Sequence, residues 1–471
     1  MSESEKALLA RVKALEEEVV RLRAQLGDKS SGLQGDKERI AVPKAQENGG
    51  SGKKEKRAFD FSLHPRRHVA LRLAYLGWQY QGFAVQENTD NTVEARLFEA
   101  LLKTKLIQDR QSSNYHRCGR TDKGVSAFSQ VISIDLRSSQ FSGLGVTVPD
   151  GVEPKAGTAQ AELPYMKMLN RVLPSDIVAL SWAPVPEGFS ARFDCQSRTY
   201  RYYFPRGELD VELMAEAAKR YEGTHDFRNL CKMDVGNGVL QFQRTILSAS
   251  VQTAEPNHPS PTDPQCLYMF QVKGLAFLYH QVRCMMAVLL LISQKLEAPE
   301  IINQLLDVEN NPRKPQYSMA VDYPLVLYEC NFEGVIWVSE PEEESHALSS
   351  LLQHWTQTAV KAQVLHGMIQ GLHTPATDNP LFTQCYLMEG SKQRNYRPLL
   401  ERPRCESLES RIQHFVKRGR LEREEGENGE EGTTVFKGKR SKHSHQVNSL
   451  NSNQGKDDVS SHKEVPSEPM S

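Results

Sequence analysis

One short stretch of this 471-residue chain combines residue types that can perform chemistry. In residues 117–125 the carboxylate of Asp122 lies among the cations of Arg117, Arg120 and Lys123, with a glycine on either side. Glycine lets a backbone turn sharply or approach a ligand closely. Nearby cations favour the ionised form of a carboxylate, which can then act as a nucleophile or a base, and they also attract phosphate. A charged surface turn would have the same composition, so both interpretations stay open at this point.

The run Gly119-Arg120-Thr121-Asp122-Lys123-Gly124-Val125-Ser126-Ala127 resembles the signature of the TruA-type tRNA pseudouridine synthases. Many members of that family have His where this chain has Ser126, a difference that we expect to affect local packing only. Other motifs similar to those of the family follow in the same order over about residues 66–330: YLG at 75–77, YQGF at 80–83, LNRVLP at 169–174, FSARF at 189–193, RTYRY at 198–202, GTHDF at 223–227 and FLYHQVR at 277–283.

The resemblance implies an α+β pseudouridine-synthase fold. Two similar α/β halves would form one mixed, mostly antiparallel sheet with flanking helices and a central RNA-binding cleft. It also implies conversion of uridine to pseudouridine in the tRNA anticodon arm, at positions 38 and 39 as in the eukaryotic branch. Asp122 would act there on a base taken out of the stack. The family needs no cofactor or metal and typically dimerises, so we expect tRNA and a second copy of the chain as partners.

The same resemblance assigns roles to two further residues. Tyr200 matches the active-site tyrosine, whose ring would stack on the flipped uracil and whose hydroxyl would relay a proton. The alternative is a strand tyrosine with a buried ring. Arg120 matches the residue that enters the anticodon arm as the base flips, and its alternative role is a simple phosphate contact.

Arg283 begins an otherwise apolar predicted helix, and a buried arginine nearly always has an anion as its partner. The resemblance implies that this partner is Asp122, whose pKa the arginine would lower. A structural pair with another acid, such as Asp226 or Glu329, is the alternative.

Five residues remain as weaker candidates for contact with RNA. Tyr80 and Phe83 stand in a glycine-containing loop, where aromatic rings can stack on unpaired bases or pack over the edge of a core. Arg117, Lys123 and Arg171 carry the positive charge that a phosphate backbone attracts.

Composition and periodicity divide the chain into segments. We expect a strand at 69–75 with one buried face, a helix capped by Asn91 with Glu94 three residues on, and a strand around 132–136. The predicted segments are a heptad-patterned, coiled-coil-like helix at 1–27, a disordered basic linker at 28–64, the two catalytic halves at 65–196 and 197–335 with an inserted loop at 139–163, a partly ordered extension at 336–420 and a disordered tail at 421–471.

The charge and the cysteine content of the chain limit the classes of protein to which it can belong. The net charge is −1, yet residues 53–72 are strongly basic and 421–431 strongly acidic, so near-neutrality does not exclude RNA. The eight cysteines are scattered without a Cys-x-x-Cys pair, which predicts free thiols and no metal site. No apolar run is long enough to span a membrane. The basic cluster at 53–57 fits a nuclear import signal, which predicts a nuclear location with the cytoplasm as a second one, and a solvated charge run is the alternative.

Two other functions compete with the synthase. A silent RNA-binding protein on the same scaffold would have no need of Asp122, Tyr200 and Arg283 together. A nucleotide glycosidase would usually have a second catalytic carboxylate, and no paired acid motif accompanies Asp122.

Overall fold

The computed structural model describes residues 59–154, 161–255, 263–372, 386–390 and 395–419. It also describes the backbone of β11 (Leu421–Arg423) and β12 (Thr434–Phe436), which pair with each other. The predicted heptad helix lies outside the described residues, as do most of the linker and most of the tail.

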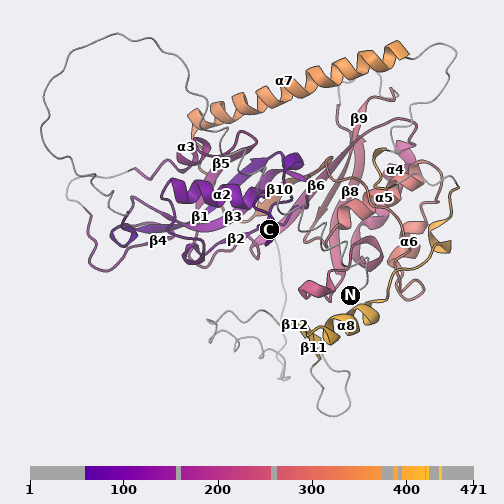
Figure 1. The fold of residues 1–471 in the computed structure, drawn as a ribbon, viewed down its shortest axis with the longest axis horizontal. Helices are drawn as coiled ribbons and strands as arrows, with labels where there is room; N and C mark the ends of the chain where they lie inside the picture. The colour runs from indigo at the N-terminus through magenta and orange to yellow at the C-terminus, as the bar shows by residue number, and fades with distance from the viewer. Residues whose placement is uncertain are drawn as a thin grey trace, which may run out of the picture. The chain divides into compact units, whose positions relative to one another are not determined.

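A ten-stranded sheet organises the described chain (Figure 1). Its main path runs β4-β1-β3-β10-β6-β9-β8-β7, while β5 pairs with β1 and β2 with β3. The pairs are antiparallel, except that β10 lies parallel to β3. The predicted mixed, mostly antiparallel sheet is therefore confirmed. Its strands are β1 (Arg66–Tyr75), β2 (His116–Arg117), β3 (Ser126–Arg137), β4 (Val146–Thr147), β5 (Ile177–Pro184), β6 (Cys195–Pro205), β7 (Gly223–Asp226), β8 (Gln243–Thr253), β9 (Leu267–Gly274) and β10 (Leu325–Phe332).

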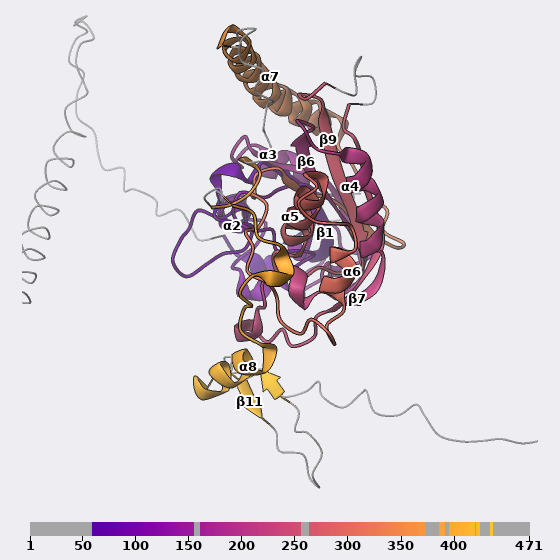
Figure 2. The same cartoon turned by 90° about the vertical axis from the view of Figure 1, so that its right-hand side faces the viewer.

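Helices cover this sheet in two groups, each with its own hydrophobic core. One core joins α2 and α3 to the strands around β1, β3 and β5. The other joins α4, α5 and α6 to β6, β8 and β9, and Figure 2 shows these helices grouped together. The helices are α2 (Val93–Lys103), α3 (Tyr165–Asn170), α4 (Val211–Ala218), α5 (Gln281–Ser293), α6 (Ile301–Leu306), α7 (Pro341–Leu372) and α8 (Leu408–Lys417).

Helix α5 is buried along its whole length, because its sequence is apolar on every side. It begins after His280, whose backbone is in the left-handed region at φ +60°. Non-glycine residues seldom adopt this conformation, so the surrounding packing must hold it. The single arginine of the helix, Arg283, is 3% exposed. The start of α5 therefore brings an imidazole and a guanidinium into the interior.

Three local predictions differ from the structure. Strand β1 is buried on both faces over most of its length, not on one, and it pairs with β3 and β5 along its two edges. Thr92, not Asn91, caps α2 through a hydrogen bond from the Ala95 amide to its Oγ1. The predicted loop at 139–163 contributes the short strand β4, which extends the sheet beside β1.

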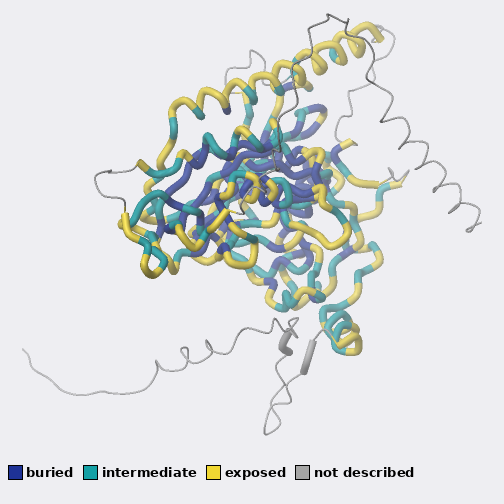
Figure 3. Tube along the Cα trace, turned by 60° about the vertical axis from the view of Figure 1, so that its left-hand side comes forward, coloured by how far each residue is buried: buried dark blue, intermediate teal, exposed yellow. Residues whose placement is uncertain are grey.

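The 32-residue helix α7 was not foreseen within the 336–420 segment. Its N-terminal part packs on α3 and β5, where Glu340 accepts a hydrogen bond from the Lys167 amide. Figure 3 shows most of this helix as exposed, in contrast to the buried strands. Its apolar residues lie on several sides, so no single stripe in the sequence marked it as one amphipathic helix.

Gly77 lies directly against the Asp122 loop, and we expect Gly77→Ala to destabilise the protein strongly. A Cβ atom at Gly77 would lie 1.9 Å from the carbonyl oxygen of Val125. Because that neighbour is backbone, relief requires movement of the loop, at a cost of about 3 kcal/mol. Urea unfolding measures the effect. Gly188→Ala is the matched control, since its Cβ would meet no atom within 4 Å. Equal stabilities of the two variants would contradict the contact.

Candidate active site

The Asp122 loop connects β2 to β3 and is held from both sides by hydrogen bonds. The Phe83 amide donates to the carbonyl of Thr121 at 3.1 Å, and the Gly124 amide donates to the carbonyl of Tyr80 at 3.2 Å. The side chain of Gln130 donates to and accepts from the backbone of Gly119. The loop is thus a rigid support rather than a free surface turn.

Buried side chains complete this support. The hydroxyls of Tyr75 and Thr121 are 2.7 Å apart and hydrogen-bonded, and the Ser126 hydroxyl accepts a bond from the Gly77 amide. Gly124 has φ +75°, and a Cβ there would collide with the carboxylate of Asp322. Ser126 thus holds the Gly77 backbone, and the expectation that its difference from the family's His affects only local packing stays a prediction.

Burial dominates the electrostatics of Asp122. Its side chain is 20% exposed, and burial raises its pKa from 3.8 to about 6. Arg283 and Lys232 act in the opposite direction, while the negative charge of Asp322 adds to the rise. The predicted lowering of this pKa by Arg283 is therefore present, but burial outweighs it. Asp122 remains mostly ionised at neutral pH, with a basicity suited to proton transfer.

His280 is a site residue to which the sequence analysis gave no role. Its Nε2 lies 3.5 Å from Oδ2 of Asp122, and its side chain is 9% exposed. Burial and the nearby cations lower its pKa to about 3, so the imidazole is neutral. Its buried Nδ1 has no hydrogen-bond partner among the described residues. The neutral ring therefore shields one side of the carboxylate from water.

We expect His280→Asn to lower kcat about tenfold and to move the acid limb of the pH–rate profile to lower pH. Asparagine tolerates the left-handed backbone but leaves Asp122 more hydrated, so the pKa of the carboxyl falls back toward 3.8. Rates measured across pH test both effects. The control is His225→Asn, because the His225 ring bonds to the Glu222 carbonyl and packs on Phe227, with no described contact to Asp122. An unchanged acid limb would show that His280 does not desolvate Asp122.

Tyr200 lies on β6, and its ring packs edge-to-face against Phe277 with centroids 5.0 Å apart. Its hydroxyl lies close to Gly119, since a Cβ built on that glycine would be 4.0 Å from it. Burial raises the pKa of Tyr200 well above its usual value, and Asp122 contributes to this rise. The hydroxyl therefore stays protonated and can donate a hydrogen bond beside the loop.

Arg283 donates to the carbonyl of Ala320 and forms an ion pair with Glu389. Its direct carboxylate partner is thus Glu389, not the expected Asp122, nor either of the acids considered as alternatives. The guanidinium still acts on Asp122 through its charge, as the lowering contribution to that pKa shows. The charge of Arg283 thus acts on two carboxylates, that of Asp122 in the loop and that of Glu389 in the segment that follows α7.

Three predicted RNA-contacting cations are exposed: Arg120, Lys123 and Arg171. No carboxylate of the described residues forms an ion pair with Arg120 or Lys123. Burial lowers the pKa of Arg120, and the positive charges of Arg117 and Arg192 add to this, while Glu94 and Asp234 act in the opposite direction. Because no described carboxylate forms an ion pair with the exposed Arg120, its charge is available to an anionic ligand next to Asp122.

The predictions for Tyr80 and Phe83 as RNA contacts are wrong, because both side chains are buried. The Tyr80 hydroxyl donates to Asp176, and the Phe83 ring packs on Tyr75. Their backbones instead hold the Asp122 loop. Tyr80 and Phe83 thus pack over the edge of the core, which the sequence analysis gave as the alternative to stacking on bases.

Arg117 serves a buried carboxylate rather than a phosphate. It forms an ion pair of 2.6 Å with Glu94, whose side chain is almost fully enclosed. Arg110 and the Tyr115 hydroxyl also donate to this carboxylate, which keeps the pKa of Glu94 below its usual value despite burial. A buried charge is tolerated only with such partners. Glu94, which the sequence predicted as part of a helix cap, is thus the carboxylate at the centre of a cluster with Arg110, Arg117 and Tyr115.

The prediction of free thiols is confirmed for the described cysteines, but the expected absence of a cluster is contradicted. The fold brings the Sγ atoms of Cys118, Cys195 and Cys330 within 4.8 Å of one another. All three are buried. The sequence held no signal for this group, because residues 118, 195 and 330 are far apart in the chain and no short spacing links them.

An apolar pocket of about 510 Å³ is lined in part by Tyr75 and Ser126, which support the Asp122 loop. Trp78, Tyr203, Tyr323 and Tyr328 line it, and Leu351 of α7 covers part of it. It contains neither Asp122 nor any other predicted catalytic residue, so we do not assign the reaction to it.

Two more residues act on Asp122 without having been predicted: Lys232 and Asp322. Neither belongs to the motifs that carried the resemblance. The FLYHQVR motif at 277–283 did contain His280, and its position next to a predicted buried arginine was the available signal.

The mixed ten-stranded sheet, with a partly buried carboxylate beside an unpaired arginine, has the form expected of a pseudouridine synthase. Residues 217–333 match a family model described as tRNA pseudouridine synthase. The chain is 54% identical over 435 residues to tRNA pseudouridine(38/39) synthase of Homo sapiens, which covers 88% of each chain.

More distant relatives extend the comparison. The chain is 40% identical over 319 residues to tRNA pseudouridine(38/39) synthase of Saccharomyces cerevisiae, covering 67% of each chain. It is 29% identical over 304 residues to tRNA pseudouridine synthase A of Thermococcus onnurineus, covering 64% of this chain and 99% of that relative. The chain belongs to the TruA-type tRNA pseudouridine synthase family, which confirms the resemblance.

Proposed function

We propose that this protein isomerises uridine to pseudouridine at positions 38 and 39 of the tRNA anticodon arm. The observation that carries the proposal is the rigid Asp122 loop. It presents a carboxylate with a pKa of about 6 beside the exposed Arg120, in a chain 54% identical to a tRNA pseudouridine(38/39) synthase.

The reaction breaks the N-glycosidic bond of uridine, turns the base and rejoins it to the ribose through a ring carbon. The proton that leaves this carbon and the proton gained by the freed nitrogen balance, so the change is an isomerisation. Asp122 acts as nucleophile or base, and both roles require its ionised form. Tyr200 and His280 close the sides of the site, and the target base must be flipped out to reach it.

Mapping of pseudouridine on transcribed tRNA tests this proposal, with binding to the same tRNA measured in parallel. We expect the wild-type protein to modify position 38 or 39. Modification elsewhere would contradict the assigned positions. Binding without any modification would favour the silent tRNA-binding scaffold.

Arg120 is the cation that we expect to meet the anticodon arm. Arg120→Ala should weaken tRNA binding and reduce the slope of log affinity against log salt by about one, because one phosphate contact is lost. Lys103→Ala, in the last turn of α2, is the control for a change of charge elsewhere. An unchanged slope in Arg120→Ala together with normal activity would exclude this role.

We also propose that the protein acts as a homodimer, as members of its family typically do. Helix α7 supports this, since Leu348, Leu352 and Trp355 are spaced by four and three residues and are all at least 50% exposed. An apolar surface of this kind marks an interface. Light scattering should give a dimer for the wild type and a monomer for Leu352→Glu/Trp355→Glu. A monomeric wild type would overturn the proposal.

The basic cluster at 53–57, which lies outside the described residues, supports a nuclear location, with a cytoplasmic share as the second expectation. Fluorescence microscopy of the tagged chain tests this location. The wild type is compared with a variant in which Lys53, Lys54, Lys56 and Arg57 are changed to alanine. Retention of the variant in the nucleus would exclude the cluster as the import signal.

A further inference from the structure

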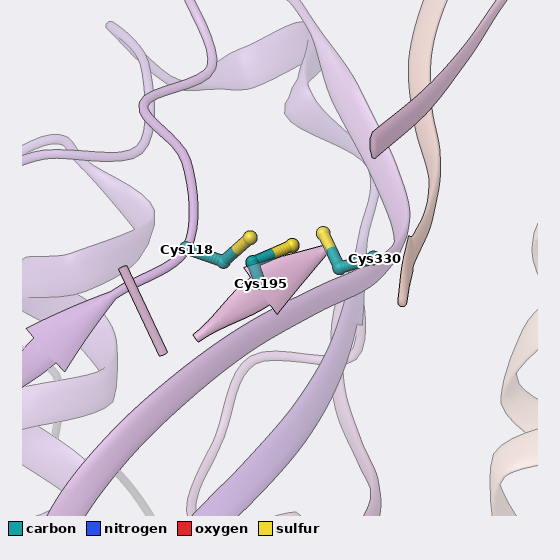
Figure 4. Close-up of side chains that lie close together, drawn as sticks. All are labelled: Cys118, Cys195 and Cys330. Carbon is teal, nitrogen blue, oxygen red and sulfur yellow. The ribbon is translucent and has the colours of Figure 1, made fainter. Parts of the chain in front are cut away.

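Three thiols outside the catalytic group converge at the base of the Asp122 loop. Cys118 follows β2, Cys195 begins β6 and Cys330 lies on β10. Their Sγ atoms lie within 4.8 Å of one another, and Figure 4 shows the three side chains next to each other. At 6%, 8% and 3% exposure they are shielded from bulk water.

The backbone determines where each of these sulfurs lies. Cys330 pairs with Arg198 in the antiparallel register of β10 and β6, and Cys195 pairs with Phe332 at the end of the same ladder. The Cys118 amide donates to the carbonyl of Val131 on β3. Because all three positions belong to sheet hydrogen bonding, the cluster is preformed rather than assembled by mobile loops.

This geometry fits a thiophilic metal ion. Thiolates select Zn²⁺ and Cu⁺ among the common biological metals. With metal–sulfur bonds of about 2.3 Å, three sulfurs around one ion lie about 4 Å apart. The sulfurs would therefore move by less than about 1 Å toward one another to reach this arrangement, starting from separations of at most 4.8 Å.

Charge also suits a bound cation. The guanidinium of Arg198 donates to the carbonyls of Cys118 at 3.3 Å and Cys195 at 3.4 Å, so it lies beside the cluster. Three thiolates with Zn²⁺ carry one net negative charge, which this arginine balances. A low-dielectric interior tolerates a charge only when it is compensated in this way.

We propose that Cys118, Cys195 and Cys330 bind one thiophilic d¹⁰ metal ion, Zn²⁺ or Cu⁺. Binding releases the protons of the coordinating thiols to solvent and forms metal–sulfur bonds without any change of oxidation state. The ion ties the segment just before Asp122 to β6 and β10. It has a structural role, distinct from the reaction at Asp122, and does not depend on the proposed substrate.

The first test is the metal content of the untagged full-length chain, purified in anaerobic reducing buffer. Elemental analysis should give about one ion per chain, and the element found separates Zn²⁺ from Cu⁺. Chelation should lower the thermal midpoint, and return of the same ion should restore it. A wild-type protein that holds no metal and takes up none would overturn the proposal, as would a disulfide within the cluster in the reduced protein.

Variants then assign the site. Cys330→Ser should reduce the amount of bound metal at least about tenfold, because one of the three coordinating thiolates is lost. Cys266→Ser is the matched control, since Cys266 is also fully buried but lies outside the cluster. Equal metal loss in both variants, or none in Cys330→Ser, would place the ion elsewhere.

X-ray absorption of the metal-loaded wild type keeps the test independent of whether any variant folds. Three sulfur neighbours at about 2.3 Å would support the site, and a shell of oxygen and nitrogen alone would overturn it.

Discussion

Asp122→Asn should abolish pseudouridine formation while making the protein more stable at neutral pH. Loss of a group that acts directly on the reacting atoms should reduce the rate at least about a thousandfold. The amide keeps the shape of the side chain but can act as neither nucleophile nor base. Binding of tRNA should stay near that of the wild type, because Arg120 is unchanged. Residual activity near the wild-type level would show that Asp122 is not catalytic.

The gain in stability follows from the raised pKa of Asp122. Since the folded pKa of about 6 exceeds the ordinary 3.8, the protonated form is favoured in the folded state. Its stabilising contribution is fully present below 3.8 and is lost as pH rises through about 6. At neutral pH the ionised carboxylate thus costs up to about 3 kcal/mol, which a neutral asparagine avoids.

Urea unfolding of both proteins at neutral pH and in mild acid measures this difference. We expect Asp122→Asn to have the higher midpoint at neutral pH, with the two curves converging in acid. For the wild type, activity should rise with pH through about 6 as the carboxyl ionises. Equal midpoints at neutral pH would show that Asp122 is better solvated than its burial indicates.

Arg283→Met should destabilise the protein by about 3 kcal/mol and move the acid limb of the pH–rate profile to higher pH. Methionine fills the space in α5 but leaves Glu389 and the carbonyl of Ala320 without their donor. Asp122 also loses its largest stabilising charge, so its pKa rises further above 6. Urea unfolding and rates across pH give the two readouts.

Glu389→Gln separates these two effects. Its amide oxygen still accepts a hydrogen bond from Arg283, and the side chain is 43% exposed, so the loss of stability should stay below about 1 kcal/mol. Asp122 keeps its cation, and the acid limb should therefore match the wild type. If Arg283→Met also left the acid limb unchanged, the charge of Arg283 would have no part in tuning Asp122.

The family, the fold class and the catalytic candidate could be predicted from the sequence, because each of them depends on local patterns of residues. Alternating apolar residues predict strands wherever a sheet has a buried face, as they did for β3. The apolar run in α5 predicted its burial, and with it an interior position for Arg283. The glycines and cations around Asp122 form one contiguous motif, so their chemistry could be recognised without knowledge of the rest of the chain.

The tertiary structure decided what depends on which distant groups meet in the interior. In the folded chain Tyr80 and Phe83 are buried. Arg283 forms an ion pair with Glu389, and the imidazole of His280 lies next to the carboxylate of Asp122. The tertiary structure also assembled three cysteines whose spacing in the chain carries no signal. The pKa of Asp122 shows the physical reason. Its neighbours in sequence are cations, which favour ionisation, but desolvation by the folded protein is the larger effect and reverses the sign.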